Sequence, residues 1–493
     1  MSDQSKSHLQ VVDEQNRETL GKNRSPGGLR VEKDALGAME IPKEAYYGIQ
    51  SRRCRENFPL KGRRIHRQLI RAMGMVKYAC IKANIKTNSL PEPIGTALLD
   101  ACREFKLGKF DDQIIVESIQ GGAGTSINMN VNEVLANRAM EILGYEKGRY
   151  DIVSPNTHVN MSQSTNDVVP TAFKVAVLMM QEPLLINLNN LYLALKGKER
   201  EFDEILTVGR THLQDALPIR LGQEFGAYAR MVQRDVHRIE AAMEDFQSVN
   251  LGATALGTGL NADPDYIRES INELAQVTGL SLRRAEHLMD ATQNTDAYVH
   301  LSGALRTAGL NLSKMANDLR LLSSGPICGL KEIRLPAVQP GSSIMPGKVN
   351  PVMAEMMNQI GFQIQGNDHV IAMASEAGQL QLNVMGPVIF KNLFESLEIL
   401  TEGTKALTDR CIQGIEVNED YCRQLVDESM VMITALNPLI GYEKSSMVAR
   451  EVLEQGGSVR EVVLKHGLLT ESQLDRVLQP KAMTEPGVLG VTS

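Results

Sequence analysis

Residues 301–322, LSGALRTAGLNLSKMANDLRLL, carry the pattern that decides the fold of this chain. Their apolar positions recur at steps of three and four residues and are Leu301, Leu305, Ala308, Leu312, Met315, Leu319 and Leu322. The same spacing recurs over 184–195 and 225–246, and further helices are predicted near 352–382 and 388–413. Such seams are typical of near-parallel, supercoiled helices, whereas separate surface helices would not need seams this long. We therefore expect a mainly α protein with a central bundle of about five long helices.

The length of 493 residues predicts more than one domain. We expect an N-terminal domain over 1–164, a central helical bundle domain over 165–418 and a small C-terminal domain over 419–493. The polar residues 1–25 are predicted to form a mobile extension, because they lack the apolar centre of a secretory signal.

Composition narrows the class of protein. Hydrophobic residues make up 43% of the chain and charged residues 23%, which is the balance of a soluble globular protein. The net charge of -7 argues against nucleic acid or an anionic membrane as a partner. No uninterrupted apolar run reaches the roughly 18 residues that cross a bilayer. Six scattered cysteines without a C-x-x-C pair indicate free thiols, and so a cytoplasmic location.

Four segments break the aliphatic pattern with dense small polar residues. They are GGAGTSINMN at 121–130, HVNMSQSTND at 158–167, GRTHLQD at 209–215 and GSSIMPGKVNP at 341–351. Hydroxyls, amides, one lysine and two histidines supply the convergent hydrogen-bond donors that a small dicarboxylate needs. Each segment alone also fits a helix cap or a turn. Four of them, each at the edge of a long helical segment, favour a binding site.

The segment 341–351 is the most informative of the four. Its glycines and Pro346 predict a mobile loop whose backbone N–H groups can approach an anion closely. Ser342 precedes Lys348 by six residues, which places a possible base near a positive charge. The alternative, a surface loop with a solvated lysine, does not predict the other three segments.

The loop sequence GSSIMPGKVNP resembles the signature loop of the aspartase/fumarase superfamily. The other three segments resemble the remaining signature regions of that family, in the same order, and the resemblance covers about residues 30–490. It implies the three-domain fold of the family, a homotetramer with a many-helix core, and active sites built from three subunits each.

Within the superfamily, the aspartase branch is favoured. QGGAGTS at 120–126, QSTN at 163–166 and AGQLQLN at 377–383 are similar to aspartases rather than fumarases. The resemblance thus implies reversible deamination of L-aspartate to fumarate and ammonia. Ile327 and Gly386 depart from the family pattern, which usually has Arg and Glu there, and these departures bear on substrate range or regulation.

The resemblance also implies roles for individual residues. Ser342 would be the general base, with the adjacent Ser343 as an open alternative. The predicted substrate-binding residues are Thr125, Ser164, Thr165, Thr211, Asn166, Ser343, Met345, Lys348 and Asn350. Among them, Lys348 and Asn350 would hold the α-carboxylate. The hydroxyls that would donate to the β-carboxylate are those of Thr125, Ser164, Thr165 and Thr211. His212 would lie near the amino group of the substrate or, alternatively, act only as an orienting residue. Glu355 would pair with the His212 imidazole.

No metal and no organic cofactor is implied. The expected partners are a small dicarboxylate substrate and further copies of the chain, without nucleic acid or membrane. The rival hypotheses are a fumarase acting on malate, a carbon–nitrogen lyase for a modified substrate, a structural relative such as a lens protein, and a small-acid binding module.

Overall fold

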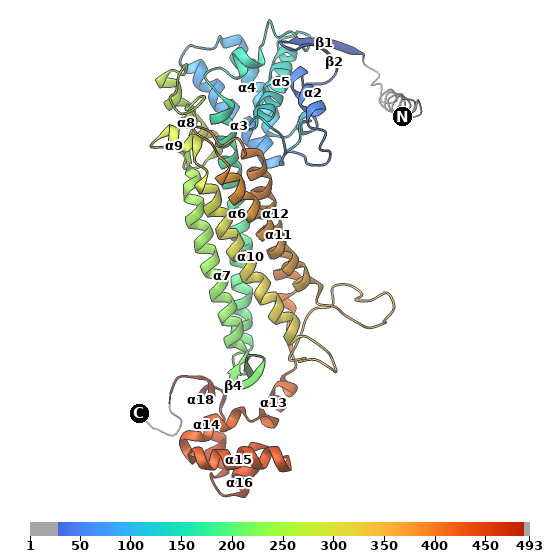
Figure 1. Ribbon diagram of the computed structural model, residues 1–493, viewed down its shortest axis with the longest axis vertical. Helices are drawn as coiled ribbons and strands as arrows, with labels where there is room; N and C mark the ends of the chain where they lie inside the picture. The colour runs from blue at the N-terminus through green and yellow to red at the C-terminus, as the bar shows by residue number, and fades with distance from the viewer. Residues whose placement is uncertain (1–27, 488–493) are drawn as a thin grey trace, which may run out of the picture. The chain divides into compact units, whose positions relative to one another are not determined.

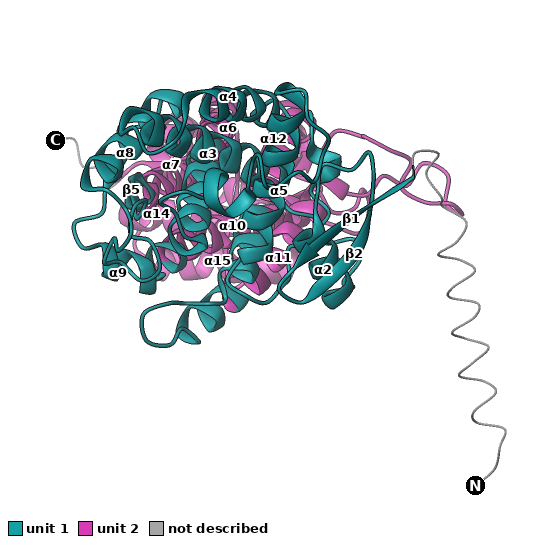
Figure 2. Ribbon diagram, turned by 90° about the horizontal axis from the view of Figure 1, so that it is seen from above, with its two compact units in different colours: residues 1–179, 244–299, 370–394 teal, residues 180–243, 300–369, 395–493 magenta. Residues whose placement is uncertain are grey.

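The computed structural model describes residues 28–487, so the predicted mobile extension at 1–25 lies outside the described residues. The chain divides into two compact units, which Figure 2 draws in different colours. Of the described residues, unit 1 comprises 28–179, 244–299 and 370–394, and unit 2 comprises 180–243, 300–369 and 395–487. The boundaries expected after residues 164 and 418 remain a prediction.

Unit 1 is mainly helical. Strands β1 (Leu29–Asp34) and β2 (Gly37–Pro42) form an antiparallel hairpin, and β5 (Ser248–Val249) and β6 (Arg283–Arg284) pair in parallel. The helices lying wholly in this unit are α2 (Ile49–Asn57), α3 (Arg67–Lys86), α4 (Glu92–Lys106), α5 (Thr125–Ile142), α8 (Pro264–Thr278) and α9 (Leu288–Gln293). Helix α4 packs between α3 and α5, and α8 also packs against α3.

Aromatic rings form the centre of the core of unit 1. The ring of Phe173 stacks on Phe390 with centroids 4.0 Å apart, and the rings of Phe394 and Tyr298 meet it edge-on at 4.9 and 5.2 Å. Aromatic residues make up only 4% of the chain, so this cluster concentrates the few that it has. Offset and edge-on ring pairs add to the free energy gained from burial alone.

Five long helices confirm the prediction of a mainly α fold. They are α6 (Thr165–Glu201), α7 (Leu221–Met243), α10 (Asp296–Leu322), α11 (Val352–Glu376) and α12 (Gly386–Arg410). Segments of all five run alongside one another in unit 2 (Figure 1). The seam that predicted α10 is buried, since Leu301, Leu305 and Leu312 have no exposed surface.

A buried amide, Asn358, and a half-buried one, Asn311, tie the bundle helices of unit 2 together. Asn358 Nδ2 on α11 donates to the Ser313 carbonyl on α10 at 2.9 Å, and Asn311 Nδ2 on α10 donates to Asp235 on α7 at 2.8 Å. Buried polar groups that are paired in this way fix the register of packed helices better than apolar contacts do.

Helix α11 ends at Glu376, before the predicted boundary at 382. The reason is a side-chain cap: Asn383 Nδ2 donates to the carbonyls of Ala374 and Ser375 at 3.0 Å each. The cap satisfies carbonyls at the end of the helix, where the Ser375 carbonyl also accepts from Gly378 N–H at 3.4 Å.

Helix α6 contains an 18-residue window with a mean hydropathy of 1.3, which by length and composition alone would suffice to cross a membrane. Of this window, 56% is buried inside the structure. A core helix of a globular protein has the same properties, and we assign α6 to the core.

Unit 2 also contains short strands and a cluster of short helices. Strands β3 (Leu206–Thr211) and β4 (Gln214–Arg220) form an antiparallel hairpin, and β7 (Ile333–Arg334) pairs antiparallel with β8 (Glu416–Val417). The short helices are α13 (Glu419–Glu428), α14 (Val431–Ile440), α15 (Tyr442–Gln455), α16 (Val459–Lys465), α17 (Glu471–Val477) and α18 (Pro480–Thr484). Their shared core includes Val426, Leu436 and Leu474 together with Val208 of β3, so this cluster is packed onto the hairpin.

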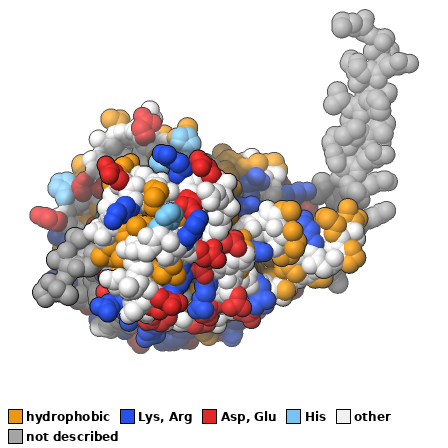
Figure 3. All heavy atoms as spheres, turned by 90° about the horizontal axis from the view of Figure 1, so that it is seen from below, with side chains coloured by type: hydrophobic (Ala, Val, Ile, Leu, Met, Phe, Trp, Pro, Cys, Tyr) orange, Lys and Arg blue, Asp and Glu red, His pale blue; other side chains and the backbone are white. Residues whose placement is uncertain are grey.

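The face drawn in Figure 3 carries Lys and Arg side chains interspersed with Asp and Glu. On this face the charges are mixed in sign, unlike the basic stripe of a nucleic-acid binding surface.

Candidate active site

Three of the predicted substrate-binding residues lie at the start of α6. The Ser164 hydroxyl oxygen accepts from Asn166 N–H at 3.2 Å, and Ser164 N–H donates to Asp167 Oδ1 at 2.9 Å. Both side chains therefore cap the helix start, the Ser164 hydroxyl at the N–H of Asn166 and the Asp167 carboxylate at the N–H of Ser164. The Asn166 amide also donates to the Ala255 carbonyl at 2.7 Å. Ser164, Thr165 and Asn166 are therefore held together at a helix N-terminus, where a carboxylate binds favourably.

A buried ammonium group anchors the residues that precede this helix. Lys77 on α3 has no exposed surface, and its Nζ donates to Gln163 Oε1 at 2.8 Å and to Asn160 Oδ1 at 3.1 Å. Asn128 Nδ2 on α5 donates to the same Asn160 oxygen at 3.0 Å and to Thr165 Oγ1 at 3.2 Å. The network thus extends from Lys77 to a predicted substrate-binding hydroxyl.

A buried carboxylate anchors the other side of the segment 158–167. Asp167 Oδ2 accepts from Gly252 N–H and Thr254 N–H at 3.1 Å each. Burial raises the pKa of Asp167 to about 6, although these N–H donors act against the rise. Burial lowers the pKa of Lys77 to about 8. Two charged groups of opposite sign therefore hold this segment from inside unit 1.

Thr125 is the first residue of α5 and follows a glycine-rich turn. Gly122, Ala123 and Gly124 have φ of 85°, 57° and 94°, a left-handed run that requires small residues. The Thr125 hydroxyl donates to the Gly122 carbonyl at 2.8 Å. Thr125 also lines a cavity of about 560 Å³ in unit 1, together with Arg53 and others. The turn exposes the hydroxyl to solvent and so to a ligand.

Thr211 and His212 lie at the tip of the β3–β4 hairpin in unit 2. Thr211 pairs with Gln214 across the turn, and His212 and Leu213 occupy its two central positions with φ of 57° and 59°. Two-residue turns of this hand favour Asn and Gly, so His and Leu are strained here. The imidazole is exposed at the tip.

The loop 341–350 carries the proposed base and the predicted carboxylate-binding lysine. Ser342 Oγ accepts from Ile344 N–H at 3.2 Å and from Met345 N–H at 3.0 Å. Asn350 Nδ2 donates to the Gly341 carbonyl at 2.6 Å and closes the base of the loop. A side chain at Gly341 would collide with the Lys348 carbonyl, since its Cβ would lie 2.1 Å away.

The remaining loop residues face solvent. Ser343, Met345 and Lys348 are exposed, while Ser342 is half-buried. Glu355 is half-buried in the first turn of α11. Among residues 28–487, the side chains of Glu355 and His212 form no hydrogen bond or ion pair with each other, and the Glu355 carbonyl accepts from Gln359 Nε2. In unit 1, the predicted residues lie at the start of α6 and at the glycine-rich turn before α5. In unit 2, they lie at the tip of the β3–β4 hairpin, in the loop 341–350 and in the first turn of α11.

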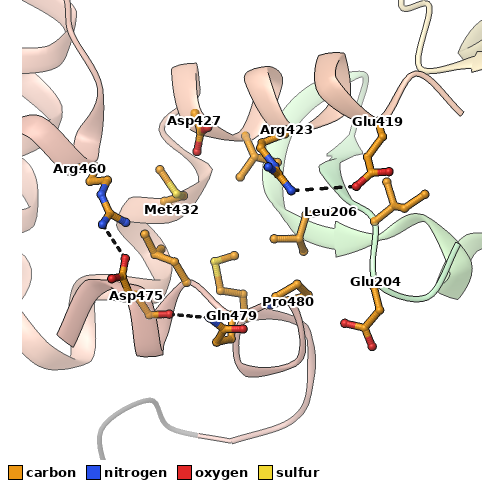
Figure 4. Close-up of a pocket in the computed structure, with 14 residues that line it drawn as sticks. Glu204, Leu206, Glu419, Arg423, Asp427, Met432, Arg460, Asp475, Gln479 and Pro480 are labelled. Atoms are coloured by element: carbon orange, nitrogen blue, oxygen red, sulfur yellow. Dashed lines mark hydrogen bonds and ion pairs between the residues drawn. The ribbon is translucent and has the colours of Figure 1, made fainter. Parts of the chain in front are cut away.

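A cavity of about 440 Å³ lies among α13, α14, α17 and α18 (Figure 4). Its charged lining is already partly paired, because Arg460 contacts Asp475 at 2.5 Å and Arg423 lies 4.0 Å from Glu419. None of the predicted site residues lines it. Within residues 28–487, the His, Cys, Asp and Glu side chains form no group of three that could hold a metal ion.

The two departures from the family pattern differ in setting. Ile327 is exposed in a loop of unit 2. Gly386 starts α12, and a Cβ there would lie 3.2 Å from the ring of Phe390 in the aromatic core. A larger residue at 386 would therefore press on that core.

Sequence reasoning missed the residues that hold the segment 158–167 from inside. Lys77 lies within an apolar helical pattern, where a lysine normally points to solvent. Its contacts with Asn160 and Gln163 join residues more than 80 positions apart. The only indication of these contacts in the sequence was that Asn160, Gln163 and Asp167 belong to the polar segment itself.

The comparisons with known proteins agree over most of the chain. A family model described as Lyase matches residues 37–366, and one described as Fumarase C C-terminus matches 432–485. The chain is 55% identical to the aspartate ammonia-lyase of Bacillus subtilis (strain 168), over 94% of this chain and 97% of that protein.

Solved structures show the same fold. A crystal structure of fumarate lyase:delta crystallin from Brucella melitensis bound to cobalt has a TM-score of 0.90 and 48% identity, covering 93% of this chain and 100% of that one. Recombinant class II fumarase from Schistosoma mansoni has a TM-score of 0.88 at 36% identity, covering 92% and 99%.

Proposed function

The chain belongs to the lyase family of these relatives, the aspartase/fumarase superfamily, and we propose that it catalyses the reversible deamination of L-aspartate to fumarate and ammonia. It is a carbon–nitrogen lyase. The identity of 55% to an aspartate ammonia-lyase, against 36% to a fumarase, favours aspartate over malate as the substrate.

The arrangement of the loop 341–350 carries the mechanistic proposal. The β-proton of aspartate is only weakly acidic, so the enzyme must stabilise a doubly charged aci-carboxylate as it forms. Ser342 Oγ takes this proton. The N–H groups of Ile344 and Met345, which already point at this oxygen, would stabilise its ionised form. The electron pair then forms the C=C bond while the C–N bond breaks and ammonia leaves.

The other predicted residues bind the two carboxylates and the amino group. Lys348 and Asn350 hold the α-carboxylate. The β-carboxylate, whose charge grows during the reaction, accepts from the hydroxyls of Thr125, Ser164, Thr165 and Thr211. Asn166 and His212 lie near the amino group. The helix N-terminus at Ser164 supports this assignment, because its partial positive charge favours a carboxylate that gains charge.

We further propose that the active unit is a homotetramer with sites shared between subunits. Large apolar side chains on the bundle helices of unit 2 are exposed in the single chain, notably Phe362 at 62%, Leu193 at 61% and Ile186 at 50%. Covering them with neighbouring copies of the chain would remove apolar surface from water. A second copy would also supply the partner that His212 and Glu355 lack in one chain. Light scattering that finds a fully active monomer would contradict this assembly.

A cytoplasmic location is proposed from the cysteines. Five of the six are buried as free thiols, and Cys328 is exposed and unpaired within the described chain. An exposed free thiol suits a reducing compartment.

One assay tests the proposed reaction. The absorbance of fumarate is followed with L-aspartate, D-aspartate or malate as the only substrate. We expect fumarate from L-aspartate alone, because a site built to pair one polar group rejects an analogue lacking it by about 10⁴ or more. Activity should rise above neutral pH as proton acceptors lose their protons. Malate formation from fumarate, with no ammonia from aspartate, would make the chain a fumarase.

A further inference from the structure

Helix α6 contains a proline four residues after Asn166, and this proline leaves one carbonyl of the first turn without its usual donor. In an α-helix the carbonyl of residue 166 accepts from the N–H of residue 170. Pro170 has no N–H, and its ring crowds that carbonyl. The side chain of Asn250 replaces the missing donor, since its Nδ2 lies 3.0 Å from the Asn166 carbonyl oxygen. Asn250 therefore holds the main chain of a residue that is predicted to lie near the amino group of the substrate.

Asn250 is itself fixed at both ends of its amide. It is 2% exposed, and its Nδ2 also donates to the Thr292 hydroxyl at 3.0 Å. Its Oδ1 accepts from the Thr171 hydroxyl at 3.4 Å. Because Thr292 belongs to α9 and Thr171 to α6, the Asn250 side chain cannot turn away from Asn166 without breaking hydrogen bonds to two helices.

Residues 250–255, which we call the strap, also fix the side chain of Asn166. Asn166 Nδ2 donates to the Ala255 carbonyl at the end of the strap, at 2.7 Å. Asp167 holds the strap against the start of α6, because its Oδ2 accepts from two strap N–H groups at 3.1 Å each. The strap is thus bonded to the main chain of Asn166 at one end and to its side chain at the other.

The strap keeps a conformation that its own residues do not favour. Thr254 has a φ of 56°, and a β-branched residue is rare in this left-handed region. Its hydroxyl is buried and has no hydrogen-bond partner among residues 28–487. Both features cost free energy instead of supplying it. Strain of this kind persists where surrounding contacts fix a residue, and it clusters at functional sites. The effect of the strap on Asn166 therefore explains it better than a contribution to stability does.

The bond to Ala255 determines which end of the Asn166 amide is left for a ligand. An amide side chain has a donating end and an accepting end of nearly the same shape. Since the Ala255 carbonyl can only accept, the NH₂ end of the amide faces it. Among residues 28–487, no group donates to Asn166 Oδ1, so this oxygen is left as a free acceptor. An acceptor attracts the N–H groups of an amino group and repels a carboxylate.

We propose that Asn250 is a positioning residue that, through the strap, fixes Asn166 as the hydrogen-bond acceptor for the amino group of L-aspartate and for ammonia in the reverse reaction. This inference rests on the proposed function and deepens it, since it assigns recognition of the amino group. All the residues involved belong to unit 1 of one chain, so the inference holds for an active site shared between subunits. The alternative is a buried asparagine that only stabilises the fold.

Asn137 provides the matched control. It is also a fully buried asparagine of unit 1, and its Nδ2 donates to the Tyr46 carbonyl at 2.7 Å and to the Tyr150 hydroxyl at 3.2 Å. Its Oδ1 accepts from Gly148 N–H at 2.7 Å. These bonds match those of Asn250 in number, but they reach neither the strap nor the start of α6. Asn137→Ala therefore reports what the loss of a buried, fully bonded amide does to the fold by itself.

The experiment compares Asn250→Ala and Asn250→Ser with Asn137→Ala in the assembled protein. Each variant is measured for its unfolding midpoint, for the KM of ammonia and of fumarate in the reverse reaction, and for binding of succinate by calorimetry. Succinate has two carboxylates but no amino group, so its affinity reports the carboxylate sites alone.

We expect Asn250→Ala to raise the KM of ammonia by about 10-fold, which is roughly the contribution of one hydrogen bond in a closed site. The KM of fumarate and the succinate affinity should stay near their wild-type values. Asn250→Ser should show a smaller rise, because one hydroxyl can donate to only one of the two acceptors. Asn137→Ala should lower the unfolding midpoint similarly while the KM values and the succinate affinity are unchanged.

A KM of ammonia that stays at the wild-type value in Asn250→Ala, or in Asn250→Ser where the first variant does not fold, overturns the proposal. An equal rise in Asn137→Ala, or an equal loss of succinate affinity in the Asn250 variants, also overturns it, because the effect would then be a general distortion.

Wild-type protein that neither deaminates L-aspartate nor adds ammonia to fumarate defeats the proposed function instead. Calorimetry with L-aspartate itself then replaces the kinetics. An affinity for L-aspartate that falls in the Asn250 variants, with succinate affinity unchanged, supports the positioning role, and an unchanged affinity for L-aspartate overturns it.

Discussion

The segment 158–167 and the loop 341–350 both carry predicted substrate-binding residues, but they are held in opposite ways. Lys77 and Asp167 hold the first through buried hydrogen bonds to Gln163 and to two backbone N–H groups. The second is mostly exposed, and the hydrogen bonds found for its side chains are local to the loop. The first region is therefore ready to bind before substrate arrives, while the second has few contacts to break when it moves.

This difference suits the chemistry that we propose. A carboxylate that gains charge is best stabilised by donors that need no reorganisation during the reaction, which the start of α6 provides. The base, by contrast, must be reached by substrate and then shielded from water, which suits a mobile loop. The loop should therefore dominate turnover, and the buried segment should dominate stability and its dependence on pH.

The largest effect is expected from Ser342→Ala. Loss of the base should lower kcat for L-aspartate by several orders of magnitude, because the proposed mechanism assigns abstraction of the β-proton to this hydroxyl. The fold and the assembly should be retained, since the Ser342 hydroxyl bonds only within its own loop. Steady-state kinetics and light scattering on the same preparation measure both.

Ser343→Ala is the matched control for this prediction. Ser343 is adjacent and exposed, and its loss should change kcat far less. If Ser343→Ala were inactive while Ser342→Ala kept nearly the wild-type kcat, the general base would be Ser343. The two N–H groups that donate to Ser342 would then have another role.

The next effect is expected from Lys348→Ala. An ion-pair partner that is desolvated in the complex contributes about 2–5 kcal/mol to binding, so KM for L-aspartate should rise by about 30-fold or more. Lys405→Ala is the control, because Lys405 is an exposed lysine whose 2.7 Å ion pair is with Asp409 on its own helix. A KM that is unchanged in Lys348→Ala would show that the loop lysine stays in solvent when substrate binds.

Much of the fold could be predicted from the sequence because its signals are local. The steps of three and four over 301–322 identify α10, and the small polar residues mark the segments that carry every predicted site residue except Glu355, which lies on α11. The hairpin β3–β4 was not predicted, since His212 and Leu213 replace the residues that usually mark such a turn.

Residues that act at a distance in sequence could not be predicted. Lys77 looks like a surface lysine until its contacts across 83 and 86 positions are seen. The buried carboxylate of Glu332 likewise accepts from the Thr207 hydroxyl, 125 positions earlier in the chain. Contacts of this kind follow from how helices pack, which the spacing of apolar residues does not specify.

The smallest effect concerns the pH dependence of stability and contrasts Lys77 with Lys348. Burial lowers the pKa of Lys77 to about 8 in the folded protein, from the usual lysine value of 10.5. Between these values the unfolded chain binds a proton that the folded chain does not, so the folded state gains stability as pH rises. The free energy of unfolding of wild type relative to Lys77→Met should therefore increase by about 2 kcal/mol between pH 7.5 and 9.5.

Lys174, whose pKa burial also lowers to about 8, is present in both proteins and cancels in the difference. Lys348→Met, which removes an exposed ammonium, should show no such slope in urea unfolding at fixed protein concentration. Equal slopes for the two variants would mean that Lys77 is solvated, and the contrast between the two regions would fail.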